Sequence, residues 1–131
     1  MTYKVEFMRE GTGFHLTGFG TVLGSEIIAA SAEAHRDEAR ARRLRYALVD
    51  LADLTEFRVA TEEVRLIVAE DMITARLAPR IVVAIVAPRD YAFGMARMWQ
   101  VFAEDTGWTT QVFRARVEAI DWLRENKVWP E

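Results

Sequence analysis

The most continuous run of apolar residues in the chain lies at residues 81–87, Ile-Val-Val-Ala-Ile-Val-Ala. Apolar and polar residues do not alternate in it, and most of its residues are β-branched, which is typical of a strand buried on both faces of a sheet. Pro88 ends the run, and Asp90 occupies the position of an N-cap before a long segment with apolar residues at helical spacing. The pattern predicts a buried strand followed by a helix.

The rest of this half continues the alternation. Gly107 separates that helix from a short β-rich segment at residues 109–113, and residues 116–126 again show helical spacing. Residues 80–127 therefore predict strand, helix, strand and helix, which is typical of a parallel α/β sheet.

In the first half, β-rich segments at residues 3–8 and 14–19 flank a glycine-containing connection, and this arrangement favours an antiparallel hairpin. The alanine-rich, charged segment 25–41 predicts a helix. Residues 45–51 are apolar without alternation and predict a third, central strand.

A further helix is expected to begin at Thr61, with the threonine hydroxyl as its N-cap. Pro79 would end this helix before the strand at residues 81–87. Its expected buried face consists of residues at helical spacing, Val64, Val68, Met72 and Ala75.

The expected order is β-β-α-β-α-β-α-β-α. Strands that alternate with helices require right-handed crossovers and a mainly parallel sheet, to which the first strand is added antiparallel. The sequence thus predicts an α/β fold, a single domain over residues 1–131 with a mixed, mainly parallel five-stranded sheet and four principal helices. The strands that contain Tyr46 and Val83 are expected in the interior of that sheet.

Composition excludes several classes of protein. The chain has no cysteine, which rules out disulfide scaffolds and thiol chemistry and suits a reducing compartment. Its net charge of −3, with both signs mixed, argues against a nucleic-acid partner. No apolar run approaches the ~20 residues of a membrane span, and Glu6 and Glu10 stand where a signal peptide would be apolar. We expect a cytoplasmic protein without membrane insertion.

Residues with candidate chemistry are scattered. Asp50 and Asp53 lie at the carboxyl end of a central strand, where α/β sheets bind ligands, and together with Arg97 they suggest a small enzyme as one alternative. The sequence contains no metal-ligand spacing, no nucleophile motif and no phosphate-binding glycine motif, so we expect no catalytic residue, metal or cofactor. His15 is predicted to be a solvent-facing or hydrogen-bonded strand residue, and His35 to be solvated on a charged helix.

The helix near residues 90–103 is the strongest candidate for a binding surface. Two interpretations of its apolar surface remain open. Either neighbouring elements bury it deeply in the core, or it forms an interface or an apolar pocket, since methionine and tryptophan side chains adapt to ligands and partner surfaces. Its apolar residues form two adjacent stripes, Tyr91, Met95, Met98 and Phe102 beside Ala92, Ala96, Trp99 and Ala103, and they cover more than the ~100° needed to dock one face. The candidate ligand or interface residues are Tyr91, Phe93, Met95, Arg97, Met98, Trp99 and Phe102.

Self-association is a further expectation. If the helices crowd one side of the sheet, apolar surface stays exposed elsewhere, and a C2 dimer would cover it with a second copy. The residues expected at such a contact are Phe93, Met95, Met98 and Trp99.

Four segments resemble the STAS-like (SpoIIAA-like) family of small bacterial proteins, which are relatives of the sporulation anti-sigma-factor antagonist. These are Leu-Val-Asp-Leu at 48–51, Val-Ala-Ile-Val-Ala at 83–87, Phe-Gly-Met-Ala-Arg at 93–97 and Glu-Ala-Ile-Asp-Trp-Leu at 118–123. The segments are mainly core and packing patterns. The resemblance implies a SpoIIAA-like βα superhelix over nearly the whole chain.

In the true antagonists of that family, a serine in an Asp-Ser-Ser-Gly-like turn at the start of the second helix is phosphorylated. The matching residues 58–63 lack the serine and the glycine, and Thr61 offers the hydroxyl group in that region. A phosphate there would face Glu62 and Glu63, so we interpret Thr61 as a helix cap rather than a phosphorylation switch.

These observations together predict a non-enzymatic regulatory or binding module. Its expected partner is an unidentified protein, a small apolar ligand or a second copy of the chain. The small enzyme that uses acidic residues at the carboxyl ends of the sheet remains the alternative.

Overall fold

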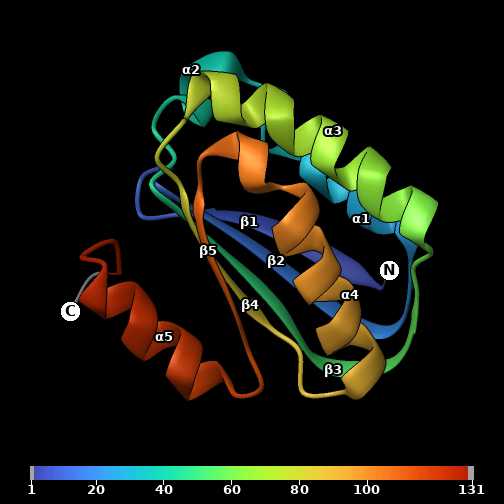
Figure 1. The fold of residues 1–131 in the computed structure, drawn as a ribbon. Coiled ribbons are helices and arrows are strands. Elements are labelled where there is room, and N and C mark those ends of the chain that lie inside the picture. The colour runs from blue at the N-terminus through green and yellow to red at the C-terminus, as the bar shows by residue number, and fades with distance from the viewer. Residues whose placement is uncertain (1, 130–131) are drawn as a thin grey trace.

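A computed structural model of the chain describes residues 2–129. Its centre is one five-stranded sheet whose strands follow one another in chain order, β1-β2-β3-β4-β5 (Figure 1). β1 and β2 pair antiparallel, and the other pairs are parallel. The strands are β1 (Tyr3–Met8), β2 (Gly13–Leu23), β3 (Tyr46–Arg58), β4 (Val82–Val86) and β5 (Thr109–Phe113). The α/β fold and the mixed, mainly parallel sheet predicted from the sequence are confirmed.

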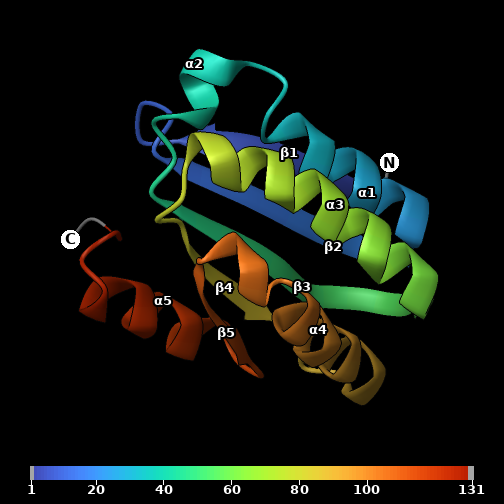
Figure 2. The ribbon, with the colours of Figure 1, turned by 45° about the horizontal axis from the view of Figure 1, so that its top comes forward.

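The helices connect the parallel strands and cover both faces of the sheet. Figure 2 shows α1 and α3 side by side along one side of the sheet, and α5 on the opposite side. The helical elements are α1 (Gly24–Glu33), α2 (Glu38–Ala41), α3 (Thr61–Leu77), α4 (Asp90–Phe102), the short 3₁₀ turn η1 (Glu104–Thr106) and α5 (Arg116–Glu125).

β4 shows why the continuous apolar run is buried on both faces. Val83 and Ile85 belong to the larger core beneath α1, α3 and α4, whereas Val82, Ala84 and Val86 belong to a second core beneath α5. β4 lies between β3 and β5, and β3 is the middle strand of the five. The prediction that the strands of Tyr46 and Val83 are interior is confirmed.

The face of the sheet under α5 is only partly apolar. α5 packs on β3, β4 and β5. On the β1–β2 half of that face, alternation within β1 and the pairing register bring together the polar side chains of Lys4, Glu6, His15 and Thr17. This half needs no helix to cover it, because its side chains are polar and those of Lys4 and Glu6 are exposed.

The predicted helix over residues 25–41 is wrong in its extent. α1 ends at Glu33, and a separate short helix α2 starts after Asp37. The Asp37 carboxylate accepts a hydrogen bond from the Arg40 backbone N–H at 3.1 Å and thereby caps α2. Capping by a mid-segment aspartate competes with a continuous helix.

Strands β2 and β3 are longer than predicted. They pair in parallel as far as Leu23 and Arg58, with register shifts on the way. The shifts place both Leu51 and Leu54 in the larger core although they are three residues apart. The extension was not predicted because β2 contains glycines and β3 contains polar residues after Leu51, so the runs of apolar residues end before the strands do.

The predicted N-caps are each displaced by one residue. The N-cap of α3 is Ala60, and Thr61 is the exposed first residue of the helix. The Glu63 carboxylate accepts from the Ala60 N–H at 2.9 Å, so a glutamate serves this helix end instead of the threonine hydroxyl. Likewise the N-cap of α4 is Arg89, and Asp90 instead accepts from the Arg114 guanidinium at 2.7 Å.

The buried face of α3 is also rotated from the prediction. Val64 and Ala75 are buried as expected, but Val68 and Met72 are only half-buried. The other buried positions of the helix are Ile67, Asp71 and Thr74. Two polar side chains therefore occupy positions where a pattern of apolar residues would place the core.

Candidate functional site

A cavity of about 110 Å³ lies between the sheet and the three helices α1, α3 and α4. Its floor comes from β2, β3 and β4, including Leu16, Val49 and Val83, and its roof from the three helices. For comparison, one water molecule needs a cavity of roughly 10–15 Å³, and an engineered apolar cavity of about 150 Å³ holds benzene. The cavity is large enough for a small organic molecule.

The lining is almost entirely aliphatic and aromatic. Three polar residues are present in it, Ser31 of α1 and Asp71 and Thr74 of α3. Asp71 and Thr74 follow Val64 and Ile67 at helical spacing, so they lie on the same face of α3, towards the core. Such a lining, apolar with a few placed polar groups, is characteristic of ligand pockets.

Asp71 forms a buried hydrogen bond between two helices that line the cavity. The indole N–H of Trp99 on α4 donates to Asp71 Oδ2 at 2.8 Å, and both side chains are buried. Burial raises the pKa of Asp71 to about 7, although the Trp99 hydrogen bond opposes this effect. Among the charged neighbours, Glu70 also raises the pKa and His35 lowers it. Asp71 is therefore protonated in a large fraction of molecules near neutral pH.

Thr74 brings to the cavity a hydroxyl group that is unpaired within the described part of the chain. Its side chain is 1% exposed, and its Oγ1 has no hydrogen-bond partner within residues 2–129. Buried hydroxyl groups in native proteins are nearly always paired, and an unpaired one costs roughly 1–3 kcal/mol. One turn separates Thr74 from Asp71, so both polar groups are available on one side of the cavity.

The predicted site residues of α4 fall on two different sides of the helix. Met95 and Trp99 line the cavity, so they are core residues rather than surface residues. Tyr91 and Arg97 are exposed. The dimer contact expected from the sequence is therefore wrong for Met95 and Trp99, because the protomer itself buries them.

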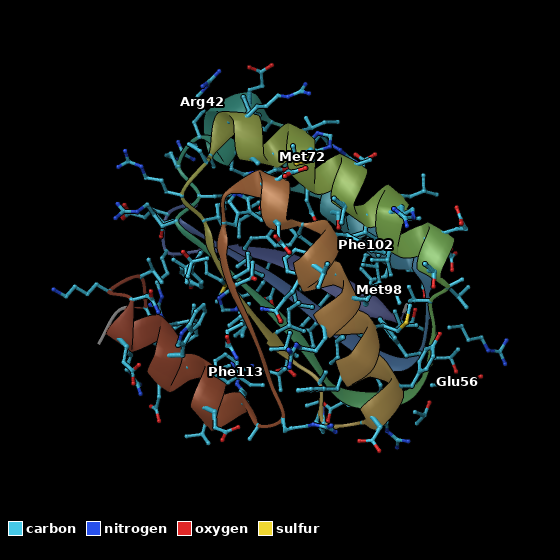
Figure 3. The ribbon with its side chains drawn as sticks, in the orientation of Figure 1. Arg42, Glu56, Met72, Met98, Phe102 and Phe113 are labelled. Atoms are coloured by element: carbon cyan, nitrogen blue, oxygen red, sulfur yellow. The ribbon has the colours of Figure 1, made fainter. Side chains whose placement is uncertain are left out.

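Three further candidate residues of α4 are half-buried and lie between its buried and its exposed side: Phe93, Met98 and Phe102. Figure 3 shows Met98 and Phe102 on the side of α4 that faces α3. The guanidinium of Arg65 on α3 lies over the Phe102 ring at 4.3 Å from its centroid. Phe93 is covered in the same way by Arg114, at 4.0 Å. These contacts assign Phe93 and Phe102 to packing between elements.

The exposed side of α4 is a shallow hollow. Gly94, Arg97, Val101 and Glu104 lie along it, and Val101 is 61% exposed. At one end of the helix, the Tyr91 hydroxyl donates to the Val59 carbonyl at 2.6 Å, which ties α4 to the end of β3. This side of α4 is separate from the cavity beneath it.

The residues that the alternative, a small enzyme, would use do not lie together in one site. Asp50 lies within β3, level with Val86 at the end of β4, and accepts from the Arg116 guanidinium on α5. Asp53 is exposed further along β3, and Arg97 belongs to the helix on the opposite face. Both acids were expected at the carboxyl end of the strand, but β3 continues to Arg58 by pairing with β2.

The histidines differ in outcome. The prediction for His15 is confirmed: its Nε2 is hydrogen-bonded to the Tyr46 hydroxyl at 2.9 Å, and its ring stacks on Trp129. Burial lowers the pKa of His15, and Arg116 adds to this effect. The prediction for His35 is wrong, because His35 lies in the turn after α1 and its Nε2 is 2.7 Å from Glu70 Oε1 on α3, with both side chains partly buried.

Asp71 and Thr74 were missed by the reading of the sequence. The signal was present: Asp71 and Thr74 continue the helical spacing of Val64 and Ile67 on the buried face of α3. The partner that makes Asp71 tolerable, Trp99, lies 28 positions away, and only the fold brings the two together.

Within residues 2–129 there is no group of three or more His, Asp or Glu side chains placed to hold a metal ion. In the same part of the chain, none of the helices combines the length and apolarity that crossing a membrane requires.

Comparison with known proteins gives structural matches. An uncharacterized protein of the DUF3478 family with a SpoIIAA-like fold, from Shewanella loihica PV-4, matches with a TM-score of 0.55 and 15% identity, over 92% of this chain and 91% of that chain. The anti-sigma factor antagonist SpoIIAA in its unphosphorylated form matches with a TM-score of 0.55 and 17% identity, over 93% and 97%. No protein-family model and no curated protein sequence matches.

At these identities the likeness establishes the fold. The fold is SpoIIAA-like, as the resemblance in the sequence implied. The two structures cover nearly all of the chain, so the likeness includes the sheet and the helices that enclose the cavity.

Proposed function

We propose that this protein is a non-enzymatic binding module whose ligand is a small apolar molecule held in the cavity between the sheet and helices α1, α3 and α4. The observation that carries the proposal is the cavity of about 110 Å³ with its nearly complete aliphatic and aromatic lining. Dense packing is the rule in protein cores, and a void of this size costs stability unless something fills it.

We also propose that the binding module has a regulatory role, and the support for this role is the fold. SpoIIAA is an anti-sigma factor antagonist, and a regulatory role for this chain is consistent with a shared fold. α4 connects the two aspects, because Met95, Ala96 and Trp99 line the cavity while Arg97 and Val101 on the same helix face solvent. Occupation of the cavity would change the position or rigidity of α4, which a partner can detect.

The test is a titration with cyclopentane, followed by NMR of the methyl groups that line the cavity. The protein is expected to bind the probe, with shifts confined to residues around the cavity. Ala96→Leu adds volume inside the cavity and is expected to abolish binding, whereas Ala69→Leu on the exposed side of α3 is the matched control and should leave it intact. Absence of binding to the unmodified protein would contradict the proposal.

A second candidate concerns self-association through the exposed side of α4. Arg97 and Glu104 flank Val101 along the shallow hollow. A two-fold axis near Val101 would place each Arg97 opposite the Glu104 of a second copy, so this surface is complementary to itself in charge. We propose a C2 dimer at this surface. Met98, a residue expected at the dimer contact from the sequence, is half-buried at the edge of this surface.

Light scattering at micromolar concentration tests the dimer. Arg97→Glu is expected to shift the protein to the monomer, and Arg97→Glu combined with Glu104→Arg is expected to restore association because the charges are exchanged in both copies. A 15 kDa monomer for the unmodified protein would remove this candidate.

We further propose that the module works without phosphorylation of Thr61. Thr61 is exposed at the start of α3, but Glu62 and Glu63 already supply negative charge to this helix end. Mass spectrometry of protein from its native host is expected to find an unmodified Thr61. A phosphorylated form that a partner distinguishes from the unmodified form would overturn this view.

A further inference from the structure

The cavity contains more polar capacity than its own protein groups use. Asp71 Oδ2 accepts the Trp99 indole proton, and among residues 2–129 no group donates to its Oδ1, which is available to another partner. Thr74 Oγ1 is buried and has no partner among residues 2–129. Both groups lie on the same face of α3, one turn apart, and both belong to the lining of the cavity.

A ligand that satisfies both groups must offer two kinds of hydrogen bond. When Asp71 is ionised, Oδ1 only accepts, and when it is protonated, its O–H donates. The Thr74 hydroxyl can do either. A hydroxyl group on the ligand fits each case, because one O–H donates once and its oxygen accepts from the other side.

Other polar groups fit less well. An ether oxygen accepts but cannot donate, so it leaves the ionised form of Asp71 without a partner. An ammonium group would bring a charge into an apolar cavity and would require Asp71 to be ionised, with a large desolvation cost for both charges. A purely apolar molecule would leave Thr74 unpaired, as it is now.

We propose, on the basis of the proposed function, that the natural ligand is a small apolar molecule that carries a single hydroxyl group, bound between Asp71 and Thr74, and that these two residues with Trp99 determine this specificity. The size of the cavity limits the ligand to about the volume of benzene or slightly less, which corresponds to alcohols of four or five carbons. Trp99 acts as a positioning residue, because its indole N–H fixes the Asp71 carboxyl group.

The experiment compares isomers of the same composition, 1-butanol and methyl propyl ether, with cyclopentane as the apolar probe and 1-aminobutane as the cationic one. Binding is measured by NMR titration of the Trp99 indole N–H signal at pH 6 and pH 8. The alcohol is expected to bind about tenfold more tightly than the ether, which corresponds to one hydrogen bond of about 1.4 kcal/mol. The indole signal is expected to shift with the alcohol at both pH values.

Variants at Thr74 separate specificity from folding. Thr74→Val keeps the shape and removes the hydroxyl, so it is expected to weaken binding of the alcohol relative to cyclopentane, whose binding it retains. Thr74→Ser keeps the hydroxyl and is expected to retain the affinity for the alcohol relative to cyclopentane. Cyclopentane binding without any preference for the alcohol, or tighter binding of the amine, would overturn this inference and leave the proposed function standing. Failure of all probes to bind would overturn both.

Discussion

At the residue scale, the two polar groups of α3 are the least expected features of the molecule. A buried aspartate and a buried threonine interrupt an apolar helix face, and each reduces stability relative to an apolar residue. Residues that lower stability and line a cavity are candidates for function, since the fold alone gives no reason for them. The consequences for stability can be measured without knowledge of the ligand.

Asp71 is expected to make the stability of the protein depend on pH. Its pKa is about 7 in the folded protein and 3.8 as the reference value for the unfolded chain, so between these values the folded state holds a proton that the unfolded state has lost. Stability therefore falls as the pH rises through this window. Asp71→Asn retains an acceptor for Trp99 and removes the titration.

The measurement is urea unfolding of both proteins at pH 5 and pH 8. The stability of the unmodified protein relative to Asp71→Asn is expected to fall by roughly 3 kcal/mol between these values. Contributions from His15 are common to both proteins and cancel. Identical pH dependence of the two proteins would show that the Asp71 carboxyl group titrates normally.

Thr74→Val is expected to stabilise the unliganded protein. The substitution preserves shape and removes a buried hydroxyl group that has no partner within residues 2–129, so about 1 kcal/mol should be gained. Thermal or urea unfolding measures the change. A loss of stability would mean that the hydroxyl is paired, by water or by a ligand that co-purifies.

At the scale of elements, β4 is the clearest case in which the sequence predicted the structure. Each of its residues is buried, because the strand is interior and has a helix layer on either face. The helix boundaries were less predictable. The caps of α3 and α4 are shifted by one residue because the Glu63 carboxylate and the contact between Arg114 and Asp90 replace the expected capping hydroxyl and carboxylate.

Val83→Asp is expected to destabilise the protein by more than about 4 kcal/mol, because Val83 is 3% exposed in the larger core and the aspartate would find no partner there. Val117→Asp on the exposed side of α5 is the matched control, with an expected change within about 0.5 kcal/mol. Denaturant unfolding compares the two. A mild effect at Val83 would contradict the burial of β4.

At the scale of the whole molecule, the sheet separates two cores that differ in packing. The core beneath α1, α3 and α4 contains the cavity, whereas the core beneath α5 consists of residues such as Tyr46, Leu48 and Leu123, each at most 1% exposed. The helices α1, α3 and α4 crowd one side of the sheet, as the sequence suggested, but α5 covers the apolar part of the other side, so the expectation of apolar surface left exposed there is wrong. The first core is suited to binding, and the second to stability.

Leu123→Ala is expected to test this division. The substitution removes a fully buried side chain from the core beneath α5 and should cost about 2–5 kcal/mol of unfolding free energy. Cyclopentane binding should remain unchanged, because the cavity lies across the sheet from Leu123. Weakened binding in a protein that is still folded would show that the two cores are coupled.

The sequence by itself determined the order of the elements, the mainly parallel sheet and the interior positions of β3 and β4. These depend on local information, the period of apolar residues and the residues that end each run, which acts within a few positions along the chain. The resemblance of four short segments to STAS-like proteins pointed to the same fold, and the structural matches confirm it.

Only the tertiary structure decided the site. The cavity is a property of the space between six elements, and no single segment records its volume. Asp71 acquires its raised pKa from burial beneath neighbouring elements, and the hydrogen bond that partly opposes this rise comes from Trp99, which is distant in the chain. Met95 and Trp99 were recognised as candidate residues, but whether they faced solvent or the interior depended on the side from which α4 packs against the sheet. Such long-range packing is not encoded in the local pattern, and this is the physical reason why the fold was predictable and the site was not.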